Sequence, residues 1–174
     1  VLKVRIKFRK YGVMRFIGHL DVMRYFQKAI RRAEVNIRYS EGFSPHQIMS
    51  FAAPLGVGIT SKGEYVDIEV LDTENSKKMI DRLNAVMSEG FEILEYKLLP
   101  DDAANAMSIV AAADYSLVFR PGYEPEKESP EEWFEKLVRF FDADHVMIMK
   151  KTKKGEREMD LKPFVYELNV RKEG

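Results

Sequence analysis

Hydrophobic and basic residues alternate strictly at the start of the chain. Residues 2–9 read LKVRIKFR, in which every second side chain is apolar and each one between is Lys or Arg. A period of two is the pattern of a β-strand with one buried face. The sequence therefore predicts a strand over residues 2–9 whose exposed face is entirely basic.

A helical pattern follows. Between residues 18 and 34, apolar residues recur at spacings of three and four, which is typical of a helix with one buried face. Asp21 falls in the first turn, where its charge suits the positive end of the helix. The predicted core stripe consists of Leu20, Met23, Phe26, Ile30 and Ala33. The remaining arc carries Arg24, Lys28, Arg31 and Arg32.

The rest of the first half predicts a regular order of elements. The apolar residues 48–59 are either a broken strand or an extended loop, because two glycines and a proline interrupt them. The other predicted elements are a strand over 37–40, a strand over 64–71, a helix over 74–88 capped by Thr73, and a strand over 91–98. Residues 1–99 thus follow the ferredoxin-like β-α-β-β-α-β order, with a long insertion at residues 41–63.

The second half is predicted to repeat this α+β unit after a linker at residues 100–106. Ser129, Pro130 and Glu132 form the signature of a capping box with proline in the first turn, so a helix should run from there to about residue 141. The other predicted elements are strands over 108–120, 145–150 and 158–161 and a helix opening at Pro163. The fold class is therefore α+β, with two tandem ferredoxin-like units at residues 1–99 and 107–174. The second unit lacks its last strand, as expected of a chain cut at Gly174.

Composition excludes several classes of function. The 174 residues include no cysteine, so the chain holds no disulfide, thiolate zinc site, iron–sulfur cluster or cysteine nucleophile. No apolar run approaches the roughly 20 residues of a membrane span. We expect a cytoplasmic protein that needs no cofactor and does not contact a membrane.

Charge is segregated along the chain although the net charge is zero. Residues 1–50 carry 11 Lys and Arg against 3 Asp and Glu, whereas residues 51–150 carry 10 against 20. A basic first third is typical of a protein that binds a polyanion, although folding can also mix the two blocks in space. The predicted phosphate contacts are Lys10, Arg15, Arg24, Lys28, Arg31 and Arg32.

Aromatic residues and histidines accompany these cations. Tyr39, Phe43 and His46 lie in or beside the turn EGFSPH, where flat side chains can stack on unpaired bases. His19 precedes Asp21 at the helix start, so it either contacts a phosphate or caps its own helix. His19 and His46 are also candidate acid–base catalysts. A metal site made from His19, Asp21 and His46 is not expected, because no helical i,i+4 histidine pair exists.

The same stretch resembles a known family. The runs RFIGHLDVMRYFQKAIRRA, YSEGFSPHQIMSFAAPLGVG and EYVDIEV closely resemble the bacterial radical-SAM-linked domain family, and TKKGEREMDLKPFV does so more weakly. Members usually carry Pro where this chain has Gln47. The family is a domain of unknown function that occurs alone or on the C-terminal side of radical SAM proteins. The chain lacks the three-cysteine cluster motif, so radical SAM chemistry would belong to a partner.

Three hypotheses follow from these observations. The leading one is an RNA-binding accessory module, associated with a radical SAM protein and acting in RNA modification or processing. The second is a metal-free RNA-processing or RNA-modifying enzyme that uses His19 and His46. The third is a docking domain whose basic face meets an acidic radical SAM partner.

Overall fold

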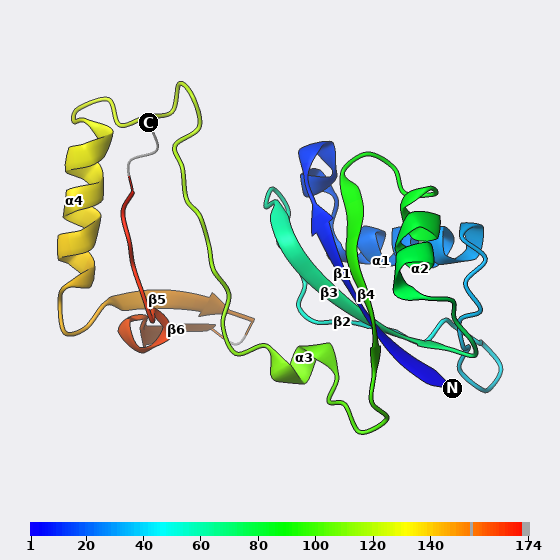
Figure 1. Cartoon of the computed structure of the whole chain (residues 1–174). Helices are drawn as coiled ribbons and strands as arrows, with labels where there is room; N and C mark the ends of the chain where they lie inside the picture. Colours follow the sequence, from blue (N-terminus) through cyan, green and yellow to red (C-terminus); the bar gives the residue numbers. More distant parts are fainter. Residues whose placement is uncertain (154, 172–174) are drawn as a thin grey trace. The chain divides into compact units, whose positions relative to one another are not determined.

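The computed structural model describes residues 1–153 and 155–171, which form two compact units, Val1–Ala113 and Asp114–Gly174. The fold is mixed α+β, with one four-stranded and one two-stranded sheet (Figure 1). The elements of the first unit are β1 (Leu2–Lys10), η1 (Gly12–Phe16), α1 (His19–Arg32), β2 (Met49–Phe51), β3 (Ser61–Val70), α2 (Ser76–Asn84), β4 (Phe91–Leu99) and α3 (Ala106–Ile109).

The four-stranded sheet is antiparallel throughout, and its strand order is β2-β3-β1-β4. The central strand β1 pairs with both neighbours, so that Ile6 lies opposite Val66 on one side and Tyr96 on the other. The strands and the two longer helices follow the predicted order over residues 1–99. Both helices, α1 and α2, cover the same face of the sheet (Figure 1).

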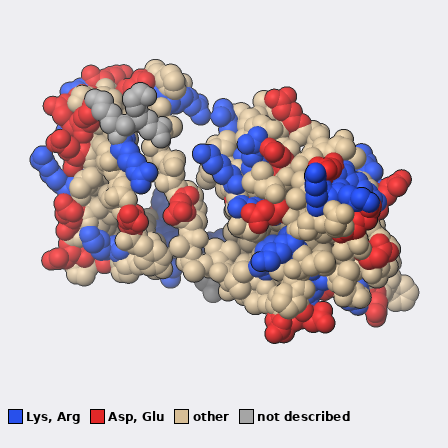
Figure 2. Space-filling view, viewed as in Figure 1, with Lys and Arg blue, Asp and Glu red and all other residues tan. Residues whose placement is uncertain are grey.

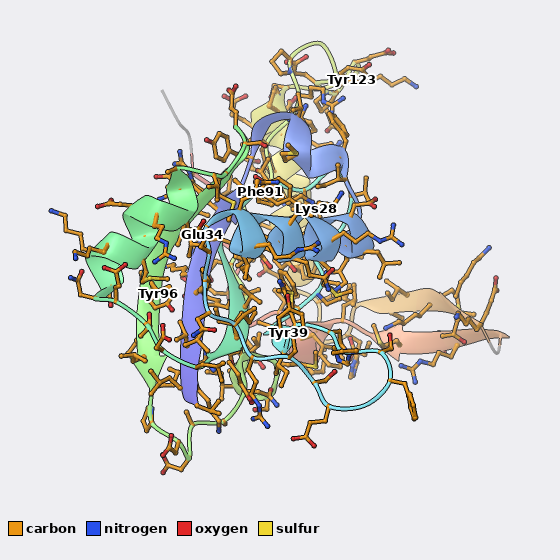
Figure 3. All side chains as sticks on the ribbon, turned by 90° about the vertical axis from the view of Figure 1, so that its right-hand side faces the viewer. Lys28, Glu34, Tyr39, Phe91, Tyr96 and Tyr123 are labelled. Carbon is orange, nitrogen blue, oxygen red and sulfur yellow. The ribbon has the colours of Figure 1, made fainter. Side chains whose placement is uncertain are left out.

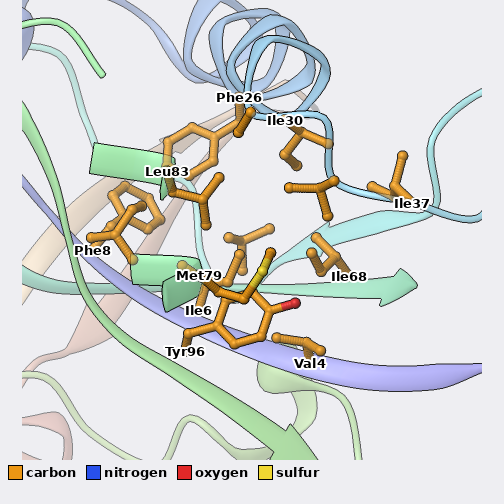
Figure 4. Packing of buried hydrophobic residues seen from close by; sticks show 14 of the residues in the cluster. Val4, Ile6, Phe8, Phe26, Ile30, Ile37, Ile68, Met79, Leu83 and Tyr96 are labelled. Carbon is orange, nitrogen blue, oxygen red and sulfur yellow. The ribbon is translucent and has the colours of Figure 1, made fainter. Parts of the chain in front are cut away.

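The core lies between this face of the sheet and the two helices (Figure 4). Every second residue of β1 points inward, as its alternating pattern predicts. Phe8 packs against Phe26 of α1, with ring centroids 4.6 Å apart, while Met79 and Leu83 contribute from α2. Burial of one such side chain contributes about 1.5–3 kcal/mol, which explains why this unit holds a defined position for each helix.

Several predictions for the first unit are wrong in detail. Residues 37–40 form only isolated bridges, and the second strand is Met49–Phe51. On α1, Leu20 is 62% exposed and Val22 is buried in its place, because the buried stripe runs through 22, 26, 29, 30 and 33. Asn75 rather than Thr73 caps α2, since its side chain accepts a hydrogen bond from the Lys78 N–H.

The first unit also extends beyond residue 99. Arg5 donates to the Ala104 carbonyl at 2.9 Å, and the Ala106 N–H donates to Asp67 at 2.7 Å. These bonds hold the segment around α3 against the outer face of the sheet. Residues 100–106, predicted to be a linker, therefore belong to this unit.

The second unit contains α4 (Pro130–Phe141), β5 (Met147–Thr152), β6 (Gly155–Asp160) and η2 (Lys162–Phe164). The predicted capping box is confirmed, because Ser129 and Glu132 exchange hydrogen bonds with each other's backbone N–H. The strand predicted over 108–120 is wrong: α3 occupies residues 106–109, and residues 110–120 pair with no strand in the described ranges. Pro163 lies in a three-residue 3-10 helix. The described elements of the two units thus do not follow one order.

Candidate functional site

The basic face of β1 is neutralised in the folded chain. Arg5 donates two hydrogen bonds to Asp67, at 2.8 and 2.9 Å, and Lys7 reaches Glu95 at 3.0 Å. Arg9 likewise pairs with Glu92. Cations and anions are accordingly interspersed over the first unit in Figure 2. The outward residues of β1 are all basic, as predicted, but β3 and β4 supply a carboxylate opposite each of these three cations.

The outer face of α1 keeps its positive charge. Arg24, Lys28, Arg31 and Arg32 are all exposed, on the side of the helix opposite the core. Arg24 lies 3.6 Å from Asp21, at the far end of ion-pair range. Lys28 has no ion pair among the described residues. The helix therefore presents four cations with a single carboxylate beside them.

Two of these arginines are partly engaged by backbone carbonyls. The Arg31 Nε donates weakly to the Gln27 carbonyl, at 3.4 Å. The Arg32 Nη2 donates to the Val86 carbonyl at 3.0 Å, and its guanidinium lies 5.9 Å from the Tyr25 ring centre. A carbonyl does not cancel the charge, so both remain cationic. Arg32 is the more restrained of the two.

The predicted aromatic turn lies beside α1 as a closed loop. The Ser40 N–H donates to the His46 carbonyl at 2.8 Å, and the Ser40 hydroxyl bonds the His46 ring at 2.9 Å. Gly42 at the tip has φ of 104°, a left-handed conformation that favours glycine. Phe43 next to it is fully exposed, so it contributes nothing to the core. The loop therefore exposes an aromatic ring to solvent.

Gln47 attaches this loop to the helix. Its side chain is only 5% exposed, and its amide N–H donates to the Gln27 carbonyl of α1 at 3.2 Å. The same amide lies 3.4 Å from the Tyr39 hydroxyl, which fixes the ring at the base of the loop (Figure 3). Gln47 thus ties the base of the loop, with Tyr39, to the middle of α1.

Lys10 and Arg15 do not belong to this exposed surface. Lys10 is 1% exposed and its Nζ donates to the Ile17 carbonyl at 2.9 Å, so it cannot meet a phosphate at the surface. Burial lowers the pKa of Lys10, and the nearby Glu64 carboxylate partly opposes that shift. Arg15 is half-buried, with its guanidinium 4.7 Å from the Phe16 ring centre.

Lys10 instead lines a hollow at the start of α1. The hollow is shallow and opens to solvent, with room for about one water molecule. His19 borders it with its ring edge-on to Phe51, the ring centres being 5.3 Å apart. Its lining residues are Phe8, Lys10, His19, Val22, Phe51, Ala53, Leu55 and Glu64.

The two candidate catalytic histidines have different neighbours. His19 contacts Phe51 in this hollow, while His46 bonds Ser40 in the loop, and no hydrogen bond or ring contact joins the histidines within the described residues. Glu64 is the lining residue that the sequence prediction missed. A signal for it existed: Glu64 continues the period of two of Val66, Ile68 and Val70 onto the inward face of β3.

Within 1–153 and 155–171, no three His, Cys, Asp or Glu side chains are grouped so that they hold a metal ion. No helix in these ranges combines the length and the apolar character that crossing a bilayer requires.

Comparison with known families identifies the chain. Residues 3–173 match the model of a family described as "Uncharacterized protein conserved in bacteria (DUF2344)". The chain belongs to this family. The match spans both units, so the DUF2344 family includes the second unit as well as the one that carries the basic helix. Comparison with curated proteins finds no match.

Proposed function

We propose that this DUF2344 protein is an RNA-binding accessory module, with the outer face of α1 as its phosphate-binding surface. The observation that carries the proposal is the contrast between two sets of cations. On β1, three of the four outward cations have a carboxylate partner and Lys3 donates to the Asp101 carbonyl, whereas on α1 only Arg24 of the four exposed cations pairs with a carboxylate among the described residues. A helix that needed only solubility gains more from mixed signs at i,i+4 spacing.

The spacing of the cations suits a nucleic-acid backbone. Arg24 and Lys28 are one helical turn apart, which is about 6 Å along the axis. Arg31 continues the row after a further turn. A strand lying along this row would release the counterions of several phosphates, which is the main source of sequence-independent affinity.

The loop beside the helix supports RNA over a smaller anion. Phe43 lies in solvent and off the core, in a loop that Gln47 ties to α1. An exposed ring at such a place stacks on unpaired bases, each stack contributing about 1–3 kcal/mol. Sequence-tolerant binding of single-stranded or looped RNA uses this combination of stacking and phosphate contact.

The test is the salt dependence of RNA binding. We expect the affinity for a short single-stranded RNA to fall linearly in a log–log plot against salt, with about 0.7 of slope per phosphate contact. Lys28→Ala with Arg31→Ala should lower the slope by about 1.4. The matched control is Lys7→Ala with Arg9→Ala, which removes two cations that already have partners and should leave the slope nearly unchanged.

Two outcomes contradict the proposal. An affinity that does not change with salt would exclude phosphate contacts. Equal losses in the two double variants would show that net charge alone, rather than the α1 face, determines binding. Phe43→Ala is a further check, because removal of the stacking ring should weaken binding without altering the salt slope.

The proposal also includes the location of the protein and its partner. We place the module in the cytoplasm, as a ferredoxin-like unit followed by a reduced second unit, and in association with a radical SAM protein that acts in RNA modification. A pull-down with and without nuclease separates an RNA-bridged association from direct docking, because only a direct protein contact survives nuclease. The proposal does not extend to catalysis, since no described contact brings His19 and His46 together.

A further inference from the structure

Exposed apolar side chains gather around η1 and the start of α1. Five large ones here are between 41 and 73% exposed, and we call them the apolar patch: Val13, Phe16, Leu20, Val57 and Ile59. The loop before β3 belongs to the patch, because the Gly58 N–H donates to the Arg15 carbonyl of η1 at 2.7 Å. Apolar side chains that gather in this way, rather than scattering singly, are typical of a surface that binds another protein.

The patch includes a cation that lacks a carboxylate partner. Arg15 forms no ion pair among the described residues, and its buried Nε has no hydrogen-bond partner there. Its guanidinium lies 4.7 Å from the ring centre of Phe16. Arginine is enriched among the residues that supply most of the affinity at protein interfaces. A carboxylate on the docked molecule would therefore complete this part of the surface.

A suitable carboxylate stands at the other end of the same short segment. The segment reads RFIGHLD, so it begins with Arg15 and Phe16 and ends with Leu20 and Asp21. Asp21 is 62% exposed, and its ion pair within α1 is long, at 3.6 Å. Two copies related by a two-fold axis at the middle of the segment would meet with Arg15 of one against Asp21 of the other. The apolar residues next to these charges then face each other.

The middle of the segment suits close approach by another molecule. Gly18, the N-cap of α1, has φ −78° and ψ 168°, an extended conformation that any residue adopts. No atom lies within 4 Å of the position that its Cβ would take, so neither backbone nor packing requires glycine here. Ser, Thr, Asp or Asn would cap the helix slightly better. Glycine does allow the backbone of a second molecule to come close.

We propose that the apolar patch is the interface of a homodimer, in which Arg15 of each copy pairs with Asp21 of the other. The inference goes beyond RNA binding, and neither depends on the other. A second copy fits because the surface carries both members of the ion pair and is thus complementary to itself. Standard interfaces bury about 800 Å² on each partner, so a patch of this size predicts a weak dimer, with a Kd of about 10–100 μM.

The test measures the mass of the full chain by sedimentation velocity in the absence of RNA. The protein concentration runs from about tenfold below to tenfold above the expected Kd, and the wild type should pass from monomer to dimer over this range. Arg15→Asp and Asp21→Arg should each raise the Kd at least about tenfold, because each variant places like charges at both contacts.

The two variants should nevertheless dimerise with each other. In the mixed dimer, one copy supplies both carboxylates and the other supplies both guanidinium groups, so both contacts are attractive again. We expect the equimolar mixture to restore the wild-type Kd to within about threefold. The mixture also shows that both variants are folded, since a chain that had lost its fold would present no patch to the other.

A matched pair of controls carries the same charge changes outside the patch. Lys97→Asp lies on β4 and Asp81→Arg on α2, and both positions are exposed. Each control should keep the wild-type Kd on its own, and mixing the two should add no affinity. Phe16→Ser tests the apolar part of the interface without changing the charge, and it should raise the Kd about tenfold.

Three outcomes would overturn the dimer. They are a wild type that stays monomeric over the whole range, Arg15→Asp that dimerises with the wild-type Kd, and a mixture of the two charge variants that stays monomeric. Because these measurements contain no RNA, each of these outcomes leaves the proposed RNA binding to its own salt test. A failure of RNA binding likewise leaves the dimer to be judged by mass.

Discussion

At the scale of single residues, side chains here have roles that residue type alone does not reveal. Lys10 and Lys7 lie on one strand and look equivalent in the sequence, but one is buried beside a hollow and the other pairs with Glu95 in solvent. The difference follows from which face of β1 each occupies.

Gly90 offers a sharp test of the packing around β1. Its φ of 102° is left-handed, and a Cβ at this position would lie 2.4 Å from the Met14 Cγ and 2.9 Å from the Tyr11 carbonyl oxygen. Gly90→Ala should therefore lower the free energy of unfolding by more than the 1–2 kcal/mol expected from left-handed strain, roughly 3 kcal/mol or more. Chemical denaturation followed by circular dichroism measures the change.

Gly42 is the matched control for this substitution. Its φ of 104° is nearly the same, but no atom lies within 4 Å of the position that a Cβ would take. Gly42→Ala should show the backbone strain alone, about 1–2 kcal/mol. Equal losses in the two variants would mean that the contact with Met14 relaxes without cost.

Sequence reasoning located residues well where a local rule determines them. The capping box at Ser129 and the alternation of β1 depend only on neighbouring residues, and both are confirmed. Leu20 and Val22 show the limit: both are apolar and lie near the helix start, and only the position of the sheet decides which is buried. The pairing of Arg5 with Asp67 joins residues far apart in the chain, so charge counts along the sequence could not reveal it.

At the scale of elements, helix and strand ends depend on polar side chains that satisfy backbone groups. Helix α1 ends with Glu34 in a left-handed conformation, φ 51°, and the Val35 N–H donates back to the Ile30 carbonyl. Arg82 of α2 donates to the Ala33 and Glu34 carbonyls and so ties this end to its neighbour. The strand predicted over 108–120 does not form. Its residues have a strand-like pattern, but no strand in the described ranges pairs with their backbone groups.

Asp160 accepts hydrogen bonds from backbone N–H groups at one end of the β5–β6 hairpin, and it makes the second unit sensitive to acid. Its carboxylate accepts from the His145 ring at 2.8 Å and from the Val146 and Lys162 N–H groups at 2.9 and 3.0 Å. The hydrogen bond to His145, followed by those two backbone bonds, lowers the pKa of Asp160 from 3.8 to about 2. Because the folded-state pKa is depressed, the stabilisation is complete above pH 4 and is lost as the pH falls towards 2.

Fluorescence of Trp133, the single tryptophan, reports on this unit. The urea midpoint of the Trp133 transition should fall between pH 4 and pH 2 in the wild type. Asp160→Asn should have a lower midpoint at pH 7 and a flatter profile in that window, since it has no charge to lose. Asp144→Asn is the control, because Asp144 is exposed and makes no hydrogen bond among the described residues. An unchanged profile in Asp160→Asn would exclude this role for Asp160.

At the scale of the whole molecule, the two units differ in how much they bury. The first has a continuous core that joins both helices to the sheet, and it carries every residue of the proposed RNA surface. In the described part of the second unit, Val146 is the one residue that is fully buried, at 2% exposed. Stability of a domain comes mainly from buried apolar area, so it should be unequally divided between the units.

This inequality predicts that residues 1–113 fold alone and that residues 114–174 form the less stable fragment. The first fragment should unfold cooperatively on heating and keep the salt-dependent RNA affinity of the full chain, because the core and the α1 surface are both retained. The second should unfold at a lower temperature and over a broader range, since a helix and a single hairpin are marginal without a shared core. Circular dichroism of the two fragments measures this, and a transition in residues 114–174 at or above the temperature of the first fragment would contradict it. If the first fragment folds but has lost RNA affinity, part of the interface lies in the second unit. The α1 surface then supplies only a share of the binding energy.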